Sequence, residues 1–184
     1  DHYNRACFDY ADIDLTTPGS KTEAFLLGYR RLHREAEKYG IRIYEGAELR
    51  FDESENDYLI YGFHHDLLAD PDRLMRGGLE QFVPAYRADG ALLIQAHPFR
   101  KKCTPAPAAW LDGVEVLNLN PRHDSRNDLA RAYAEEHGLI MTSGSDCHRP
   151  GDEAKGGILS ETLPEDGFAF ADLLRTGKYQ LITP

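Results

Sequence analysis

Residues 91–100 read ALLIQAHPFR, an apolar run that ends in a histidine, a proline and an arginine. A short apolar run of this kind is typical of a strand that is buried on both faces of a sheet. Two later segments follow the same plan, GVEVLNLNP at 113–121 and LIMTSGSDCH at 139–148. Each keeps its polar residues at the carboxyl end, where parallel sheets and barrels collect their active sites.

The rest of the chain alternates between helical and extended patterns. Helical spacing of apolar residues predicts helices over about 21–38, 71–88, 124–137 and 168–175, the second weakened by Gly77, Gly78 and Pro84. Extended patterns predict a strand from Ile41 that runs into a turn at Gly46, and further strands over 57–63 and 178–182. This order favours an α/β fold with a mainly parallel sheet. A length of 184 residues fits one domain over 1–184.

Composition excludes several classes of protein. With 31 acidic and 21 basic residues, a net charge of −10 argues against a sequence-independent nucleic acid binder. Three well-separated cysteines argue against a disulfide framework. No apolar run is long enough to cross a bilayer, and the first residues lack a secretion signal. We therefore expect a cytoplasmic protein without a membrane partner, and its oligomeric state stays open.

Candidate metal ligands stand at the ends of the predicted strands. Glu48, His97, Asp146 and His148, together with His2 near the start, offer the oxygen and nitrogen donors that suit manganese, iron or zinc. Each residue alone has a plain structural alternative. The Asp-x-His pair is explained equally well by a hydrogen-bonded turn, the histidine before Pro98 by a core position, and the glutamate by a surface charge. Their combination at several strand ends favours a metal centre.

Four short motifs in the same order resemble those of the PHP family, the metal-dependent phosphoesterases named for polymerase and histidinol phosphatase. DH at 1–2 resembles the end of a Thr-Asp-His motif, and EGAE at 45–48 resembles a Gly-x-Glu motif. AHPFR at 96–100 resembles a His-Pro motif, and GSDCH at 144–148 resembles the terminal Ser-Asp-x-His motif. The motifs are spread over most of the chain.

The resemblance implies a distorted (β/α)7 TIM-like barrel, present here as a single PHP domain over 1–184. It implies two or three divalent metal ions (Mn, Fe or Zn) at the C-terminal rim of the barrel. It also implies hydrolysis of a phosphate ester of a small metabolite or nucleotide through a metal-activated water. The expected partner is therefore a small phosphorylated substrate.

Carried over by position, the resemblance assigns a role to each motif residue. Glu48 would bridge two ions, with His97 on one of them and Asp146 on the other. The remaining ligand positions fall on His2, on His148 and, as a direct ligand or as a neighbour of the ligands, on Asp1.

Two departures from the family pattern are visible. The family's His-x-His pair at the end of its first strand is absent, so we expect a barrel without its first strand in this chain and an ion with fewer ligands. The usual histidine on the strand after Gly-x-Glu is also absent, and Asp57 is the expected substitute. The alternative is that Asp57 starts the strand and faces water.

Basic residues near these motifs are candidates for binding the substrate phosphate. Arg100, Lys101 and Arg122 carry the charge that such a group needs. His123 either contacts phosphate or transfers a proton, or it faces water at the start of its helix. The expected catalytic residues are Glu48, His97, Asp146 and His123.

Three other functions fit parts of the sequence. A metal-binding or regulatory PHP relative with weakened turnover fits the missing His-x-His pair. A barrel hydrolase acting on C–N bonds uses similar ligands, but it usually needs a bridging lysine, which no strand end supplies. Cys147 is a poor nucleophile, because consecutive side chains on a strand point to opposite faces and His148 would face away from it. We expect Cys147 to pack instead as a small residue turned away from the ligands.

Overall fold

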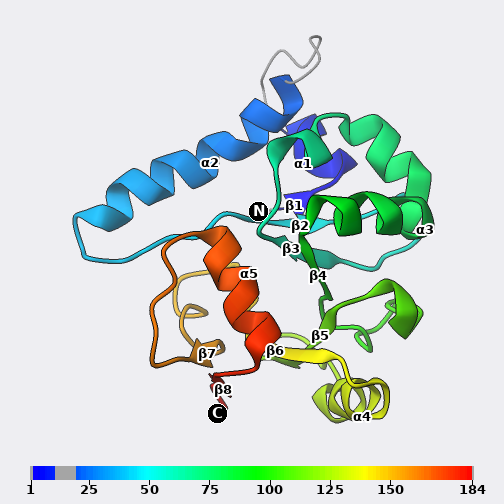
Figure 1. The fold of residues 1–184 in the computed structure, drawn as a ribbon, viewed down its shortest axis with the longest axis vertical. Coiled ribbons are helices and arrows are strands. Elements are labelled where there is room, and N and C mark those ends of the chain that lie inside the picture. The colour runs from blue at the N-terminus through cyan, green and yellow to red at the C-terminus, as the bar shows by residue number, and fades with distance from the viewer. Residues whose placement is uncertain (1, 11–19, 184) are drawn as a thin grey trace.

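Six short strands form one sheet, and their order in the sheet follows the sequence (Figure 1). The computed structural model describes residues 2–10 and 20–183. The strands are β1 (His2–Tyr3), β2 (Gly46–Leu49), β3 (Tyr58–Tyr61), β4 (Leu92–Gln95), β5 (Gly113–Asn118) and β6 (Ile140–Gly144).

One strand of this sheet is reversed. β3 is antiparallel to both β2 and β4, whereas the other neighbouring pairs are parallel. The mainly parallel sheet expected from the sequence is therefore confirmed, as a mixed sheet with one reversed strand. Because of the reversal, the beginning of β3 lies beside the ends of β2 and β4. This arrangement brings the start of one strand to the edge where the others finish.

Helices cover both faces of the sheet. Alternate residues of β3 enter different cores, Tyr58 and Ile60 one core, and Leu59 and Tyr61 the other. The first core also receives buried residues of the helices on its side, which are α1 (Arg5–Tyr10), α2 (Ser20–Glu37), α3 (Pro71–Asp89) and α4 (Asn127–His137). The second core packs against α5 (Gly167–Thr176), which lies beside β3 and β6 in Figure 1.

Three small elements complete the described chain. Two 3-10 helices, η1 (His65–Leu68) and η2 (Ala108–Trp110), precede α3 and β5. β7 (Ile158–Leu159) and β8 (Gln180–Leu181) pair with each other as a separate two-stranded sheet. Within residues 2–10 and 20–183 no strand pairing joins β1 to β6, so these strands form an open sheet and the expected seven-stranded barrel is not shown.

The predicted strand before Gly46 is wrong. β2 begins at Gly46, where the sequence suggested a turn, and residues 41–45 are irregular. The reason is the length of the neighbouring strand: Gly46 is opposite Tyr61, the last residue of β3, so earlier residues have no partner. The Tyr44 hydroxyl instead donates to the Pro164 carbonyl at 2.7 Å, and the Arg42 guanidinium donates to the same oxygen.

α3 shows how a weak helix is held in place. Asp70 caps its start by accepting from the Arg73 amide at 3.0 Å. Gly78 interrupts it with φ 76°, a left-handed value that glycine adopts without strain. The amide freed next to this break, that of Leu79, donates to the Glu53 carboxylate at 2.8 Å. The interruption expected from the glycines thus occurs at Gly78, and a side chain from outside the helix caps it.

None of the helices in the described residues combines the length and the apolar character needed to cross a membrane.

Candidate metal centre

Strand register brings three of the predicted ligands together. His2 of β1 is the register partner of Glu48 in β2, and Glu48 is in turn opposite Leu59 of β3. Asp57 precedes Leu59 by two residues, so its side chain points to the same face of the sheet. One ligand atom from each of His2, Glu48 and Asp57 lies within 4.8 Å of the others.

His97 extends this group from the end of β4. Its Nε2 atom lies 3.7 Å from Glu48 Oε1 and 3.8 Å from Asp57 Oδ2, and its ring is buried. Its backbone, two residues after the end of β4, has φ 30°, an uncommon value for a residue other than glycine. Burial opposes protonation of the ring, but contacts with Cys103 and Glu48 prevail and raise the pKa of His97 to about 9. The carboxylates around it therefore make this position favourable for a positive charge.

The donor atoms of this group fit a divalent ion. His2 Nδ1 is buried and has no hydrogen-bond partner among the described residues, although Glu48 Oε2 is 3.7 Å away. A buried polar atom without a partner costs free energy, and a cation between the imidazole and the carboxylate would remove that cost. Imidazole and carboxylate donors together suit manganese, iron or zinc. We refer to His2, Glu48, Asp57 and His97 as the His2 cluster.

Asp57 has a cationic neighbour that the sequence reading missed. Arg50 donates to it through two parallel bonds, Nε to Oδ1 at 2.7 Å and Nη2 to Oδ2 at 2.6 Å. Arg50 follows Glu48 by two residues, and this spacing along a strand is the signal that was available. The pair fixes the orientation of the buried Asp57 carboxylate. The expectation that Asp57 lies at the cluster agrees with its position, and the alternative that it faces water does not.

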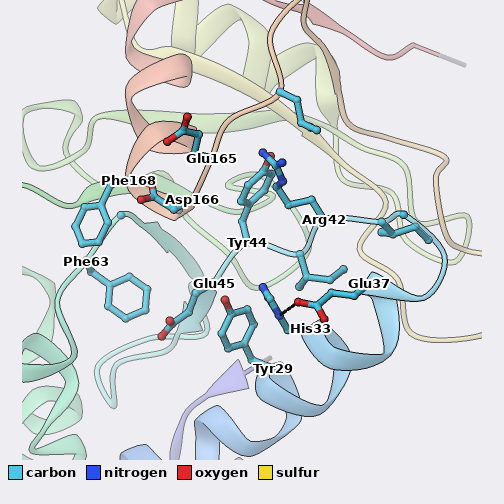
Figure 2. Close-up of a pocket in the computed structure, with 16 residues that line it drawn as sticks. Tyr29, His33, Glu37, Arg42, Tyr44, Glu45, Phe63, Glu165, Asp166 and Phe168 are labelled. Atoms are coloured by element: carbon cyan, nitrogen blue, oxygen red, sulfur yellow. Dashed lines mark ion pairs between the residues drawn. The ribbon is translucent and has the colours of Figure 1, made fainter.

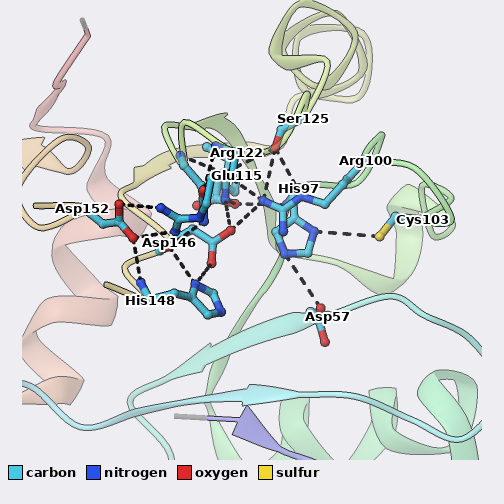
Figure 3. A network of polar contacts seen from close by, with 12 residues as sticks. Asp57, His97, Arg100, Cys103, Glu115, Arg122, Ser125, Asp146, His148 and Asp152 are labelled. Atoms are coloured by element: carbon cyan, nitrogen blue, oxygen red, sulfur yellow. Dashed lines mark hydrogen bonds and ion pairs between the residues drawn. The ribbon is translucent and has the colours of Figure 1, made fainter. Parts of the chain in front are cut away.

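Asp146 lies in a second polar network, seen in Figure 3 with Arg100 and His148. Arg100 Nη2 donates to Asp146 Oδ2 at 2.6 Å and to Asn118 Oδ1 at 2.9 Å. Burial would raise the pKa of Asp146, but the Arg100 guanidinium prevails and holds that pKa below its usual range. Asp146 is thus a carboxylate that already has a cation.

Glu115 of β5 links the two networks, because it contacts both His97 and Asn118. It is buried and accepts from the His97 amide at 3.1 Å and from Asn118 Nδ2 at 3.0 Å. Burial raises its pKa. The sequence reading did not select Glu115, although a glutamate inside the apolar run GVEVL is a usable signal, because charges are rarely buried without a structural or chemical reason.

His148 and Cys147 lie at the exposed edge of this network. His148 is 52% exposed, and its Nδ1 donates to the Asp146 carbonyl at 2.9 Å. Its ring centroid is 6.2 Å from that of His2. Cys147 is exposed, so the expectation that it packs inside is wrong. The reason is that β6 ends at Gly144, and the residues after it leave the sheet. Asp1 lies outside the described residues.

The predicted phosphate-binding residues do not form one free basic pocket. Arg100 is paired with Asp146, and Arg122 is paired with the buried Asp152 through bonds of 2.8 Å and 2.5 Å. Lys101 and His123 are exposed. The turn that carries His123 is close to the network, because Asn120 of that turn donates to the Asp146 carbonyl at 3.0 Å. Two of the four residues, Arg100 and Arg122, are thus held by carboxylates, whereas Lys101 and His123 extend into solvent.

A pocket of about 740 Å³ lies at the opposite ends of β2 and β3 (Figure 2). Its walls come from the segment before β2, the residues after β3, the end of α2 and the start of α5, and include Tyr29, Tyr44, Phe63 and Phe168. None of the predicted site residues lines it. The candidate metal ligands and this pocket therefore lie toward opposite ends of β2 and β3.

Comparisons with known proteins find solved structures with a similar fold and a family model that matches one segment of the chain. Residues 124–153, which include Asp146 and His148, match the family model described as PHP-associated. The structure of PsfC from Pseudomonas syringae PB-5123 is similar at a TM-score of 0.58 and 20% identity. The similarity covers 72% of this chain and 57% of that one, so this chain spans little more than half of PsfC.

A second solved structure is similar at a lower level. It is that of a "putative metal-dependent phosphoesterase" from Bifidobacterium adolescentis, with a TM-score of 0.49, 14% identity, and coverage of 67% of this chain and 74% of that one. No protein with curated function matches the chain. The chain thus has an α/β fold shared with PsfC and a PHP-associated segment at residues 124–153, which confirms the resemblance to the PHP family.

Proposed function

We propose that this chain is a metal-dependent phosphoesterase that hydrolyses a phosphate ester of a small metabolite or nucleotide. The observation that carries the proposal is the convergence of His2, Glu48 and Asp57, whose donor atoms lie within 4.8 Å of one another. The PHP-associated segment supports the same reaction class. We also propose that the whole protein forms a closed (β/α)7 barrel.

The His2 cluster would hold the ion. A divalent ion with such ligands lowers the pKa of a water ligand and polarises a phosphoryl oxygen. The surrounding residues keep the ligands in place: Arg50 orients Asp57 through two bonds, and Glu115 accepts from the His97 amide. Oriented ligands of this kind raise metal affinity, because less order has to be gained on binding.

Substrate binding would use polar side chains at the exposed edge. Lys101 follows Arg100 in the chain and His123 lies on the turn that contacts Asp146 through Asn120, and both are exposed. The Lys101 ammonium and an imidazole N–H of His123 would meet a phosphate dianion without breaking an ion pair that the described residues show. Arg122, in contrast, would have to leave Asp152 to reach a phosphate. We therefore give Lys101 and His123 the leading part in holding the phosphate.

Glu48→Gln is the variant that tests the proposal. Glutamine keeps the shape of the side chain and removes its charge, so bound metal and hydrolysis of p-nitrophenyl phosphate should both fall, by about 10- to 100-fold or more. Metal analysis after incubation with manganese, iron or zinc measures the first, and release of p-nitrophenol measures the second. Glu45→Gln is the matched control, because Glu45 pairs with His65 at 2.8 Å away from the cluster.

Two results would contradict the proposal. Unchanged metal content in Glu48→Gln would remove Glu48 from the ligands. A metal-loaded wild-type protein that hydrolyses no phosphate ester would instead support the second candidate, a metal-binding relative without turnover. That candidate is favoured by one observation, the pairing of both Asp57 and Asp146 with arginines.

A further inference from the structure

We propose that the guanidinium of Arg100 takes the place of a metal ion at Asp146, so that the centre holds a single ion, at the His2 cluster. This inference rests on the proposed function, because it concerns how many ions the same centre binds. It departs from the two or three ions that the resemblance to the PHP family implies.

Several hydrogen bonds hold the Arg100 side chain in the network. Its Nη2 atom donates to Asp146 Oδ2 at 2.6 Å, to Asn118 Oδ1 at 2.9 Å and to Ser125 Oγ at 3.2 Å. The Arg100 side chain is 16% exposed and that of Asp146 10%. A short, charge-assisted bond in a mostly buried place is among the stronger polar interactions in proteins. The guanidinium is therefore a structural part of the site.

The Oδ2 atom of Asp146 has two side-chain donors, Arg100 Nη2 at 2.6 Å and Asn118 Nδ2 at 3.2 Å. His148 Nδ1 lies 3.2 Å from the other oxygen, Oδ1, but donates to the Asp146 backbone carbonyl at 2.9 Å. An ion bound at Oδ2 would have to displace Arg100 and Asn118. It would also stand next to a guanidinium that keeps its charge at every physiological pH, and two cations at such distances repel each other.

The His2 cluster differs from Asp146 in the number of candidate ligands that meet there and in having a donor atom without a hydrogen-bond partner among the described residues. Within residues 2–10 and 20–183, three metal-ligating side chains come together at His2, Glu48 and Asp57, and Asp146 is not in that group. Glu48 faces two imidazoles and pairs with no arginine among the described residues, and His2 Nδ1 still lacks a hydrogen-bond partner there. Asp57 of the cluster is itself paired with Arg50, so the free donor atoms that the described residues show at this position are those of His2 and Glu48. Among the described residues, the structure thus offers a carboxylate that faces imidazoles alone at Glu48 and one whose charge an arginine already balances at Asp146.

Metal stoichiometry tests the inference. The protein is freed of metal with a chelator, saturated with MnCl2 or, separately, ZnCl2, passed through a desalting column and analysed for metal by mass spectrometry. We expect one ion per wild-type chain and a doubling in Arg100→Ala, where Asp146 and His148 become available. Arg100→Lys retains a cation beside Asp146 and should keep a single ion. Arg122→Ala is the matched control, since its partner Asp152 is outside the group of candidate ligands found in the described part of the chain, and it should also keep one ion.

Asp146→Asn adds a measurement that does not need Arg100 to be changed. If Asp146 is no ligand, the metal content of this variant stays at that of the wild type, whereas loss of an ion overturns the inference. A wild type with two or more ions, or an Arg100→Ala protein that folds by circular dichroism and still holds one, also overturns it and leaves the proposed function intact. A wild type that binds no ion overturns both.

Discussion

At the scale of single residues, pairing of opposite charges separates the acidic side chains of the centre into two kinds. Arginines pair with Asp57, Asp146 and Asp152, at 2.6 Å, 2.6 Å and 2.5 Å respectively. Glu48 is of the other kind, because its ion-pair partners among the described residues are histidines alone, His2 and His97, each at 3.7 Å. A carboxylate without a permanent cation gains most from a bound metal ion. This difference explains why Glu48 is the residue on which metal binding is expected to depend most.

Asp112 provides a residue-scale prediction about pH. Burial raises the pKa of its carboxyl above the ordinary value, while its Oδ2 accepts from the Leu93 amide at 2.8 Å. A raised pKa means that the folded state binds the proton more tightly than the unfolded state. The associated stabilisation is complete below the ordinary carboxyl pKa, about 4, and is lost as the pH rises through the folded-state pKa.

Asp112→Asn should therefore be more stable than the wild type at about pH 7, and this advantage should shrink at about pH 4. The asparagine oxygen still accepts from Leu93, so the hydrogen bond is retained. Urea unfolding of both proteins at the two pH values measures the difference. An advantage of equal size at both pH values would show that the charge of Asp112 is not its cause.

At the scale of elements, side-chain caps complete the helices, and for α3, the helix that its glycines and proline weaken, one cap comes from elsewhere in the chain. α3 combines Gly77, Gly78 and Pro84, yet it runs from Pro71 to Asp89 because Glu53 caps the break at Gly78. α5 is capped by Asp166, the residue before its first turn, which accepts from the Ala169 amide at 2.8 Å and so satisfies a free helix-end donor. Caps of this kind let weak sequences form helices of useful length.

Gly78→Ala is the element-scale prediction. The residue has φ 76°, and an added Cβ would lie 2.2 Å from Glu53 Oε2. Alanine would be strained and would also displace the carboxylate that caps Leu79, so we expect a loss of about 1–3 kcal/mol in the free energy of unfolding. Thermal or chemical denaturation measures this loss.

Gly77→Ala is the matched control for that experiment. Its added Cβ would meet nothing closer than Gln81 Oε1, at 3.4 Å. Alanine is the better helix former, so this variant should be as stable as the wild type or more stable by up to about 1 kcal/mol. If both variants lost the same stability, the strain at Gly78 would not be the cause.

At the scale of the whole molecule, the His2 cluster draws on four different parts of the chain. His2 comes from β1, Glu48 from β2, Asp57 from the start of β3, and His97 from the end of β4. β1 lies at the edge of the sheet and pairs with β2. An ion held by these residues would link the edge strand to the centre of the sheet.

Metal binding should therefore stabilise the whole fold. At a free ion concentration 100-fold above the dissociation constant, linkage gives about 2.7 kcal/mol. For a chain of this length that corresponds to a rise of about 5–10 °C in the melting temperature. Calorimetry or fluorescence with and without MnCl2 or ZnCl2 measures the shift.

His2→Ala should lose most of that shift, because it removes a ligand of the edge strand. His33→Ala is the control: His33 is on α2 and lies 3.6 Å from Glu37, away from the cluster, so this variant should respond to metal as the wild type does. An equal metal response in His2→Ala and the wild type would exclude His2 from the ligands.

The sequence by itself determined most of the elements and a large part of the candidate site. Strand and helix positions are set by local hydrophobic period and by caps, and β3 to β6 and α2 to α5 lie where the patterns predicted them, within a few residues. His97 and Asp146 were found for a similar reason, since they follow the apolar segments ALLIQ and LIM within a few residues, and Glu48 was found through the short EGAE motif. Such signals lie within a few residues of the feature that they predict.

Only the tertiary structure decided which of these groups meet. The reversal of β3, which brings Asp57 to the edge of the sheet where β2 and β4 end, depends on pairing between strands far apart in the sequence. The same holds for the arginines: Arg100 and Asp146 are 46 residues apart, and nothing in either segment alone indicates their ion pair. Partners of this kind are selected by register and packing, because a side chain pairs with whatever charge the fold places within its reach.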